Sequence, residues 1–282
     1  MKISVKQMKG EHLLVIISFA LILISIQAVQ PAKASAQASI LPNHSGYLDT
    51  TSIPITYHVV GEIENTGTTN LQWLKVTANF YDENNSLIGS SSSYALLDVL
   101  LPGRKTPFEV VLKDSNVNRI KNYTLTLQFN EYIYEKPLGL EILKSTTYID
   151  EAGFQKVNGT VKNITAKNAT AVKVAATFYD EEGKVRGVAY SYTTPSTIGP
   201  NQTALFELEL KRKGLFFPNY ILTAESLEYA MVPEFPSLNF CCILIFLSLT
   251  MLFFQLKVHN HNRAGAKIKN KIKGCFHLSL EG

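Results

Sequence analysis

Cysteine is missing from the middle of this chain of 282 residues, since none occurs between residues 35 and 234. The three cysteines that the chain does have, Cys241, Cys242 and Cys275, all lie near its C-terminal end. Small exported domains that cannot build a sufficient core usually depend on disulfide bonds. The middle of this chain must instead be held together by the burial of apolar side chains.

Histidine is almost as scarce, because His44 and His58 are the only two in the same region. That region has no His-x-x-x-His metal pair and no glycine-rich phosphate loop, and its many serines and threonines lack a recognisable base and orienting group. Catalysis seldom proceeds without an ionisable group of shifted pKa in a pocket. We therefore predict that the chain is not an enzyme and has no cofactor.

Two acidic segments, residues 82–85 and 180–183, bring several oxygen ligands together. Calcium takes about six to eight oxygen ligands, and the EF-hand spacing is absent from both segments. One short turn supplies too few of them. The composition of both segments is instead typical of solvated hairpin turns, so we predict no metal site.

The first 34 residues have the features of a secretory signal peptide. Lys2, Lys6 and Lys9 form a basic start, residues 13–26 form an apolar run, and residues 32–38 contain three overlapping Ala-x-Ala frames. The apolar run is too short to span a membrane comfortably, which takes about 20 residues. We predict a cleaved signal peptide over residues 1–34, and the alternative is an uncleaved N-terminal anchor.

A second apolar stretch, residues 235–256, is long enough to cross a membrane and contains no charged side chain. The tail that follows, residues 257–282, carries six Lys and Arg residues and one acidic residue, Glu281. Cytoplasmic flanks of membrane spans collect Lys and Arg. We predict a C-terminal transmembrane helix over 235–256 and a basic cytoplasmic tail over 257–282, with the preceding residues outside the cell. A buried core helix is the weaker alternative.

The net charge of +4 comes from the two ends of the chain. Residues 1–34 and 257–282 together hold ten of the 27 Lys and Arg and two of the 23 Asp and Glu. The segment between them therefore has 17 basic and 21 acidic residues and a net charge of −4. A mildly acidic surface argues against a nucleic-acid partner.

The middle of the chain repeats itself at an offset of 98 residues, the distance from Gly61 to Gly159. The same offset aligns Asn65 with Asn163, Phe80-Tyr81-Asp82-Glu83 with Phe178-Tyr179-Asp180-Glu181, Ser93-Tyr94 with Ser191-Tyr192, and Phe108-Glu109 with Phe206-Glu207. We interpret residues 40–136 as one small domain, repeat 1, and residues 138–231 as its copy, repeat 2. The linker between them, residues 135–139, is short, which limits hinge motion without removing it.

Apolar and polar residues alternate within each repeat. The predicted inward faces include Leu74, Val76, Ala78 and Phe80 in repeat 1 and Val172, Val174, Ala176 and Phe178 in repeat 2. The predicted outward faces hold Lys75, Thr77, Asn79 and Tyr81, and Lys173, Ala175, Thr177 and Tyr179. One apolar and one polar face is typical of antiparallel sheets packed on one side. With turn residues between the runs, this pattern predicts an all-β fold in which each repeat is a β-sandwich.

The shared blocks Gly-x-[Ile/Val]-x-Asn, Lys-Val-x-Ala-x-Phe-Tyr-Asp-Glu and Phe-Glu-x-x-Leu resemble the FxLYD family of prokaryotic surface domains. The resemblance covers most of both repeats and implies two tandem immunoglobulin-like β-sandwiches. The sequence departs from the family's name motif, because Ala78 and Ala176 stand where the family has its leading Phe.

The segment Pro233-Glu234-Phe235 resembles a second pattern, an archaeal surface-protein tail of Pro-Glu-Phe, a hydrophobic helix and a basic end. Some proteins with that tail are cut and re-attached by a sortase-like enzyme. The basic tail is longer here than in that pattern, which favours a plain membrane anchor.

N-glycosylation sequons, Asn-x-Ser/Thr, occur only in the part of the chain that we expect to be exported. They begin at Asn43, Asn84, Asn122, Asn158, Asn163, Asn168 and Asn201. An exported and exposed asparagine in such a motif is an acceptor for an N-glycan. We predict that several carry glycans, although a region rich in Asn, Ser and Thr also produces the motif by chance.

Tyrosine is abundant, with Tyr94, Tyr132, Tyr134, Tyr190 and Tyr192 on the predicted strands and turns. Outward tyrosines can stack on sugars or anchor a protein partner. They are also at home as cross-strand pairs on a sheet face. The sequence leaves both roles open.

Together these features predict a single-pass cell-membrane protein whose bulk is extracellular and whose C-terminus is cytoplasmic. We expect a structural, spacer or adhesive binding role in the cell envelope, with the membrane and an envelope protein or glycan as partners and no nucleic acid. The alternative is an accessory or sensor subunit of a membrane complex in transport or signalling. The span has few polar residues for helix association, which argues mildly against that alternative.

Overall fold

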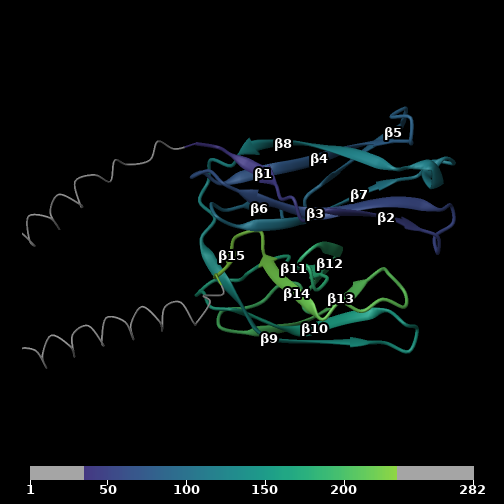
Figure 1. Cartoon of the computed structure of the whole chain (residues 1–282). Coiled ribbons are helices and arrows are strands. Elements are labelled where there is room, and N and C mark those ends of the chain that lie inside the picture. Colours follow the sequence, from purple (N-terminus) through teal and green to yellow (C-terminus); the bar gives the residue numbers. More distant parts are fainter. Residues whose placement is uncertain (1–34, 234–282) are drawn as a thin grey trace, which may run out of the picture. The chain divides into compact units, whose positions relative to one another are not determined.

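A computed structural model of the protein describes residues 35–233 (Figure 1). The predicted signal peptide (1–34), transmembrane helix (235–256) and basic tail (257–282) lie outside the described residues. Over 35–233, no helix is long and apolar enough to cross a membrane. The helical structure there is one short 3-10 turn, and strands make up the fold, which is all-β as the alternation predicts.

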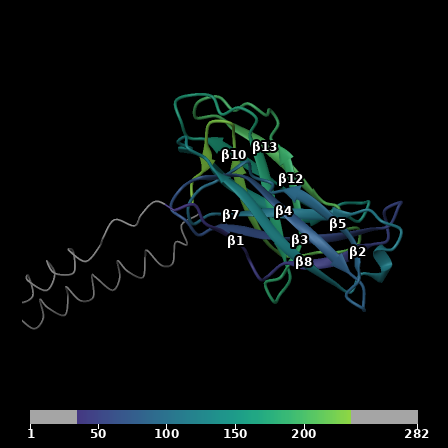
Figure 2. The same ribbon diagram turned by 90° about the horizontal axis from the view of Figure 1, so that it is seen from above.

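Repeat 1 consists of two layers of antiparallel strands, which are seen edge-on in Figure 1 and one behind the other in Figure 2. Its elements are β1 (Ala38–Ile40), β2 (Ser45–Asp49), β3 (Thr56–Asn65), β4 (Leu71–Tyr81), β5 (Leu87–Tyr94), β6 (Val99–Leu100), β7 (Lys105–Leu112), the 3-10 turn η1 (Val117–Arg119) and β8 (Asn122–Glu131). In one layer β3 pairs with β1, β2 and β7, and in the other β4 pairs with β5, β6 and β8. The two layers form a β-sandwich.

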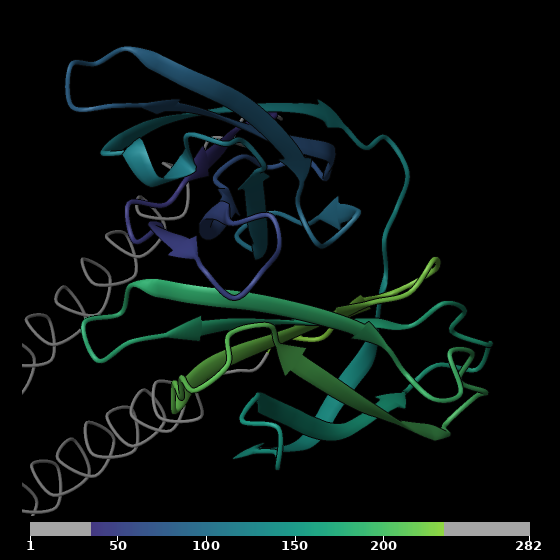
Figure 3. The same cartoon turned by 90° about the vertical axis from the view of Figure 1, so that its right-hand side faces the viewer.

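Repeat 2 has a similar arrangement of strands (Figure 3), in which β9 stands where repeat 1 has β1 and β2, and a single bridge between Ala169 and Ile198 replaces β6. Its strands are β9 (Leu138–Ile149), β10 (Gln155–Asn163), β11 (Lys173–Tyr179), β12 (Val185–Tyr192), β13 (Thr203–Leu210), β14 (Asn219–Glu225) and β15 (Ala230–Met231). The layers β9-β10-β13 and β12-β11-β14 match those of repeat 1, and β15 joins them by pairing with both β14 and β9. The shared sequence blocks therefore lie on equivalent strands, namely β3 and β10, β4 and β11, and β7 and β13.

Each repeat has its own apolar core, one formed within residues 59–120 and the other within residues 140–231. The residues predicted to face inward on β4 and β11 are all buried. Gly61 pairs across the sheet with Phe108, and a Cβ on Gly61 would lie 2.7 Å from Phe108 Cζ. Gly159 and Phe206 form the same pair at 2.5 Å. Glycine is needed at both positions because the phenyl ring lies over its backbone.

Asn65 and Asn163 close the same corner in both repeats. Both are fully buried. Asn65 Nδ2 donates to the carbonyls of Thr69 at 2.8 Å and Leu100 at 2.9 Å. Asn163 Nδ2 donates to the equivalent carbonyls of Lys167 and Ile198, at 2.7 and 2.9 Å. The Asn shared by the two Gly-x-[Ile/Val]-x-Asn blocks is thus a structural residue whose buried side chain hydrogen-bonds the backbone of its own corner.

The Asp of each Phe-Tyr-Asp-Glu block shapes the hairpin that follows it. Asp82 Oδ1 accepts the backbone N–H of Asn84 and Ser86, both at 2.9 Å. Asp180 Oδ1 accepts those of Glu182 and Lys184 at 3.1 and 2.9 Å in the same way. Such turns are a common use of Asp. Both acidic segments are hairpin turns, and within 35–233 no group of three or more His, Cys, Asp and Glu residues is placed to hold a metal ion.

Candidate functional site

The outer face of β11 is covered by repeat 1. We predicted an exposed polar face there, and for repeat 2 that prediction is wrong, because Lys173, Ala175 and Thr177 are all buried. Their counterparts Lys75 and Thr77 on β4 of repeat 1 are partly exposed, as predicted. The difference arises because the polar face of β11 packs against the other repeat, where it forms a junction of charged, aromatic and apolar side chains.

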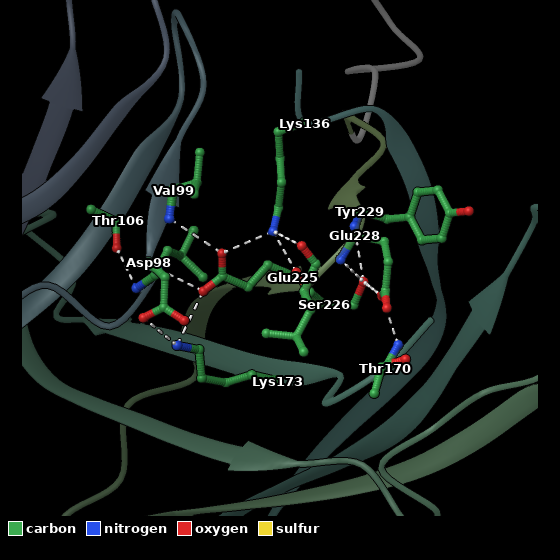
Figure 4. A network of polar contacts seen from close by, with 12 residues as sticks. Asp98, Val99, Thr106, Lys136, Thr170, Lys173, Glu225, Ser226, Glu228 and Tyr229 are labelled. Atoms are coloured by element: carbon green, nitrogen blue, oxygen red, sulfur yellow. Dashed lines mark hydrogen bonds and ion pairs between the residues drawn. The ribbon is translucent and has the colours of Figure 1, made fainter. Parts of the chain in front are cut away.

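A network of charges lies at one end of this junction (Figure 4). Lys173 at the start of β11 pairs in register with Glu225 at the end of β14, and its Nζ lies 3.1 Å from Glu225 Oε1. Glu225 Oε1 also accepts the backbone N–H of Asp98 in repeat 1 at 2.7 Å. The Asp98 carboxylate in turn lies 3.2 Å from Lys173 Nζ. The Glu225 carboxylate of repeat 2 therefore binds the backbone of Asp98 in repeat 1 directly. It is also linked to the Asp98 side chain through Lys173.

Lys136 in the linker completes the network. Its Nζ donates to the carbonyls of Ser226 and of Leu227, the latter at 3.1 Å, and lies 4.0 Å from Glu225 Oε2. The side chain of Lys136 is only 4% exposed. The linker is therefore fastened to repeat 2 by a buried ammonium group, which restricts the hinge motion that its short length alone would allow.

Burial and charge pairing oppose each other in this network. Burial raises the pKa of Glu225 above its usual range, although Lys173 and the backbone N–H of Asp98 counteract it. Burial by itself would lower the pKa of Lys173, but the Glu225 and Asp98 carboxylates outweigh it and raise that pKa. Burial lowers the pKa of Lys136. An ion network of this kind is stable only with every partner in place, because a lone buried charge is costly.

The middle of the junction is an apolar cluster, and a second polar contact lies next to it. Val60 of β3 packs with Val185 and Val188 of β12 in a cluster that both repeats supply. Beside it, Tyr179 donates its hydroxyl to Glu62 Oε1 at 2.6 Å, and burial together with this hydrogen bond raises the pKa of Tyr179. The junction therefore has the composition of a protein interface, with an apolar centre and polar contacts at its edge.

A third contact between the repeats contains a hydroxyl, an imidazole and a carboxylate in a row, an arrangement that sequence reasoning missed. Thr56 Oγ1 lies 2.8 Å from His58 Nε2, and His58 Nδ1 lies 2.8 Å from Glu109 Oε1. The order resembles that of a hydrolase triad. However, Thr56 is only 4% exposed. Tyr47 stacks on the His58 ring with the ring centroids 4.9 Å apart, and the guanidinium of Arg212 lies over the Tyr47 ring. Thr56 is buried, and the contact of Arg212 from repeat 2 with Tyr47 from repeat 1 makes the arrangement part of the junction.

A groove of about 510 Å³ opens beside the charged network. Three aromatic residues of repeat 1 line it, namely Trp73 on β4, Tyr94 on β5 and Tyr132 after β8. Asp98 and Lys136 lie at its charged side, and Leu227 of repeat 2 closes another part of the wall. Trp73 and Tyr94 meet edge to face with their ring centroids 6.0 Å apart, and their exposed fractions are 61% and 54%. The groove combines open aromatic faces with polar groups, which is typical of a ligand site.

The seven sequons fall into three groups. Asn84, Asn122, Asn168 and Asn201 are exposed, and Asn43 and Asn158 are partly buried. Asn163 is fully buried, and its Nδ2, the atom that would carry a glycan, already donates to backbone carbonyls. The folded structure argues against a glycan on Asn163. Asn43 also uses its Nδ2, which donates to Glu62 Oε2 at 3.1 Å in the junction.

Comparisons with known proteins assign no family to the chain. No family model matches it. No curated protein matches it either. Among solved structures, weak similarity is found to a red sea bream transglutaminase (8% identity, TM-score 0.22, 70% of this chain and 30% of the other). A second is an exo-chitosanase of Amycolatopsis orientalis (11% identity, TM-score 0.24, 66% of this chain and 26% of the other). A third is a β-glucuronidase of Bacteroides uniformis (12% identity, TM-score 0.24, 62% of this chain and 25% of the other). The chain spans less than a third of the length of these three, and similarity at this level supports no inference about activity.

Proposed function

We propose that this chain is a membrane-anchored extracellular protein of the cell envelope with a non-catalytic structural, spacer or adhesive role. The order of its sequence features supports the proposal. An N-terminal signal pattern precedes the β-sandwiches, and an apolar stretch without charges and a basic tail follow them. In this proposal the sandwiches are immunoglobulin-like and of the FxLYD type, and residues 235–256 form a transmembrane helix.

The observation that carries the proposal furthest is the junction between the repeats. The ion network of Lys136, Lys173, Glu225 and Asp98, together with the Val60 cluster, ties the two sandwiches into one stiff element. A stiff element suits a spacer or a scaffold that presents a surface at a fixed place, because hinge motion would spread that surface over many orientations.

Protease shaving of intact cells tests this function. Peptides from residues 40–231 should be released from intact cells, while peptides from 257–282 should appear only after lysis. Release of the tail peptides, or protection of the repeats until lysis, would contradict the proposed topology.

The competing function is an accessory or sensor subunit of a membrane complex. The basic tail favours it, since residues 257–282 are longer than a simple stop-transfer signal requires. Scrambling the tail at constant charge separates the two functions. An unchanged phenotype is expected if the tail only rests on anionic lipid, whereas loss of function would indicate a specific cytoplasmic partner.

A further inference from the structure

Trp73 stands in a backbone conformation that large side chains rarely adopt. Its φ is 54°, in the left-handed region. It lies in a β-bulge, because the pairing of β4 with β8 shifts between Gln72 and Lys75, so Trp73 and Leu74 together stand opposite a single residue. Glycine is the usual residue at a left-handed bulge position. A non-glycine residue there is strained by about 1–2 kcal/mol, and such strain is often retained for function.

Repeat 2 shows that the left-handed conformation does not require an aromatic residue. Its equivalent residue is Ala171, with a nearly identical φ of 52°. Tyr192 is the counterpart of Tyr94, and it is also exposed. The same left-handed φ therefore carries a methyl group in one repeat and an indole in the other. The Trp73 side chain is mostly exposed and contributes little to the core, so its presence is not explained by packing.

The groove in front of Trp73 has the chemistry of a sugar site. Trp73 and Tyr94 present aromatic faces on which the C–H face of a pyranose ring can lie. The Tyr132 hydroxyl and the Asp98 carboxylate at the wall supply partners for sugar hydroxyl groups. Asp98 is the exposed charge here, with 74% of its side chain open to solvent, while the side chain of Lys136 is only 4% exposed. An open carboxylate disfavours an acidic sugar.

We infer that the groove formed by Trp73, Tyr94, Tyr132 and Asp98 binds an uncharged glycan, with Trp73 as its stacking platform. The inference rests on the proposed function, since a glycan at the cell surface is within reach only of an extracellular domain. It gives the adhesive role a site and a class of ligand. It also explains why the two repeats differ at this position, because the groove needs Leu227 of repeat 2 as a wall for repeat 1.

The chain offers a direct probe of the groove, because Trp73 is its only tryptophan. Fluorescence of the full-length protein, with unmodified asparagines and in a detergent without a sugar headgroup, would be followed during titration with neutral oligosaccharides. The probes are cellohexaose, chitohexaose and mannohexaose, with oligogalacturonate of equal length as the acidic comparison. We expect a saturable change in Trp73 emission with at least one neutral oligosaccharide, and binding of the galacturonate at least about tenfold weaker.

Variants then separate the site from general effects, with binding measured by calorimetry. Trp73→Ala and Trp73→Gly should each weaken binding at least about tenfold, as expected for a central aromatic anchor. The Trp73→Gly variant should keep its melting temperature, because relief of the left-handed strain offsets the added freedom of glycine in the unfolded chain. Tyr192→Ala, the matched change in repeat 2, should leave binding unchanged.

Three results would overturn the inference. They are no saturable response to any of the neutral oligosaccharides, equal or tighter binding of the galacturonate, and wild-type binding by both Trp73 variants. Self-association that depends on Trp73 would assign the groove to a second copy of the chain instead. The cell-shaving experiment is independent of the groove, so a failure of sugar binding with surface exposure intact contradicts only this inference.

Discussion

Lys173 and Glu225 face each other across β11 and β14 at 3.1 Å, at the position where repeat 1 pairs Lys75 with Gln128. The lysine at this aligned position thus stands opposite a neutral amide in repeat 1 and a carboxylate in repeat 2. The carboxylate occurs in the repeat where the lysine is buried. The comparison identifies Glu225 as the residue that offsets the desolvation cost of burying Lys173 at the junction.

The first prediction follows from this comparison. Glu225→Gln keeps the size of the side chain and reproduces the residue of repeat 1, but it leaves Lys173 and Lys136 buried with less compensating charge. We expect a loss of about 3 kcal/mol or more in the free energy of unfolding, the usual result of removing one partner of a buried ion pair. Denaturant unfolding measures it. Gln128→Ala is the control, and it should stay within about 0.5 kcal/mol of the wild type as an exposed substitution.

The second prediction concerns the corner residues Asn65 and Asn163. Replacing either by Ala removes at least two side-chain hydrogen bonds to backbone carbonyls and one from a backbone N–H, and each such bond contributes about 0.5–1.5 kcal/mol. We expect both variants to lose at least about 2 kcal/mol of stability in thermal or denaturant unfolding. Asn168→Ala, which changes an exposed sequon, should have little effect. Equal stability of Asn163→Ala and Asn168→Ala would contradict the structural role of this corner.

A third prediction uses the same asparagines in a different measurement. Glycopeptide mass spectrometry of the protein from its native cells should find added mass at exposed sequons, foremost Asn84, Asn168 and Asn201. It should find Asn163 unmodified, because its amide nitrogen is enclosed in the corner. Full occupancy at Asn163 would show that the corner is not formed as described, and no modification at any site would contradict the predicted glycosylation.

The two hairpin aspartates give a pH dependence of known sign. The backbone N–H of Ser86 is the main cause that lowers the pKa of Asp82. Burial opposes the shift at Asp180, but hydrogen bonds from the Lys184 N–H and from Arg186 outweigh it and lower that pKa as well. A lowered carboxyl pKa contributes stability that is fully present above the unfolded value of about 4 and is lost as the pH falls through the folded value.

This sign gives the fourth prediction. Melting temperatures should fall between about pH 4 and pH 2, and the double variant D82N/D180N should fall less steeply over the same range, because Asn cannot titrate. At pH 7 the variant should be the less stable protein, since it lacks the charge-assisted bonds. Parallel pH profiles of the two proteins would exclude a contribution from the hairpins.

Much of the fold could be predicted from the sequence, because period-two alternation depends on local order alone. Leu74, Val76, Ala78 and Phe80 are buried as predicted, and the turn residues fall between strands. The burial of Lys173 could not be predicted in this way, since the alternation places both Lys173 and Lys75 on a polar face. Only the pairing of β11 with β14 and the approach of the other repeat bury it, and both are long-range relationships.

The candidate groove was missed for a related reason. Tyr94 and Tyr132 are recognisable in the sequence as outward tyrosines, but the bulge that places Trp73 beside Tyr94 has no local signature. Asn163 shows the opposite error, where a local motif suggested a surface glycan. The sequence did hold a signal, because Asn163 aligns with Asn65. Asn65 stands in Asn65-Thr66-Gly67, which is not a sequon, so the asparagine is kept in both repeats without the glycosylation motif.

The last prediction tests the junction with a matched pair of substitutions. Thr77 lies on the outer face of β4 and Thr177 on the outer face of β11, where the aligned counterpart of Thr177 is Asn79. Thr77 is partly exposed, but Thr177 is 3% exposed and lies between Lys173 and Tyr179, which both contact repeat 1. Thr177→Asp places an unpaired charge in the junction, which costs several kcal/mol unless the repeats separate. We expect calorimetry to resolve two melting transitions in this variant, one for each core, and faster hydrogen exchange in β3 and β12. Thr77→Asp should melt like the wild type, because its side chain reaches water; if both variants melt alike, the junction does not couple the two sandwiches.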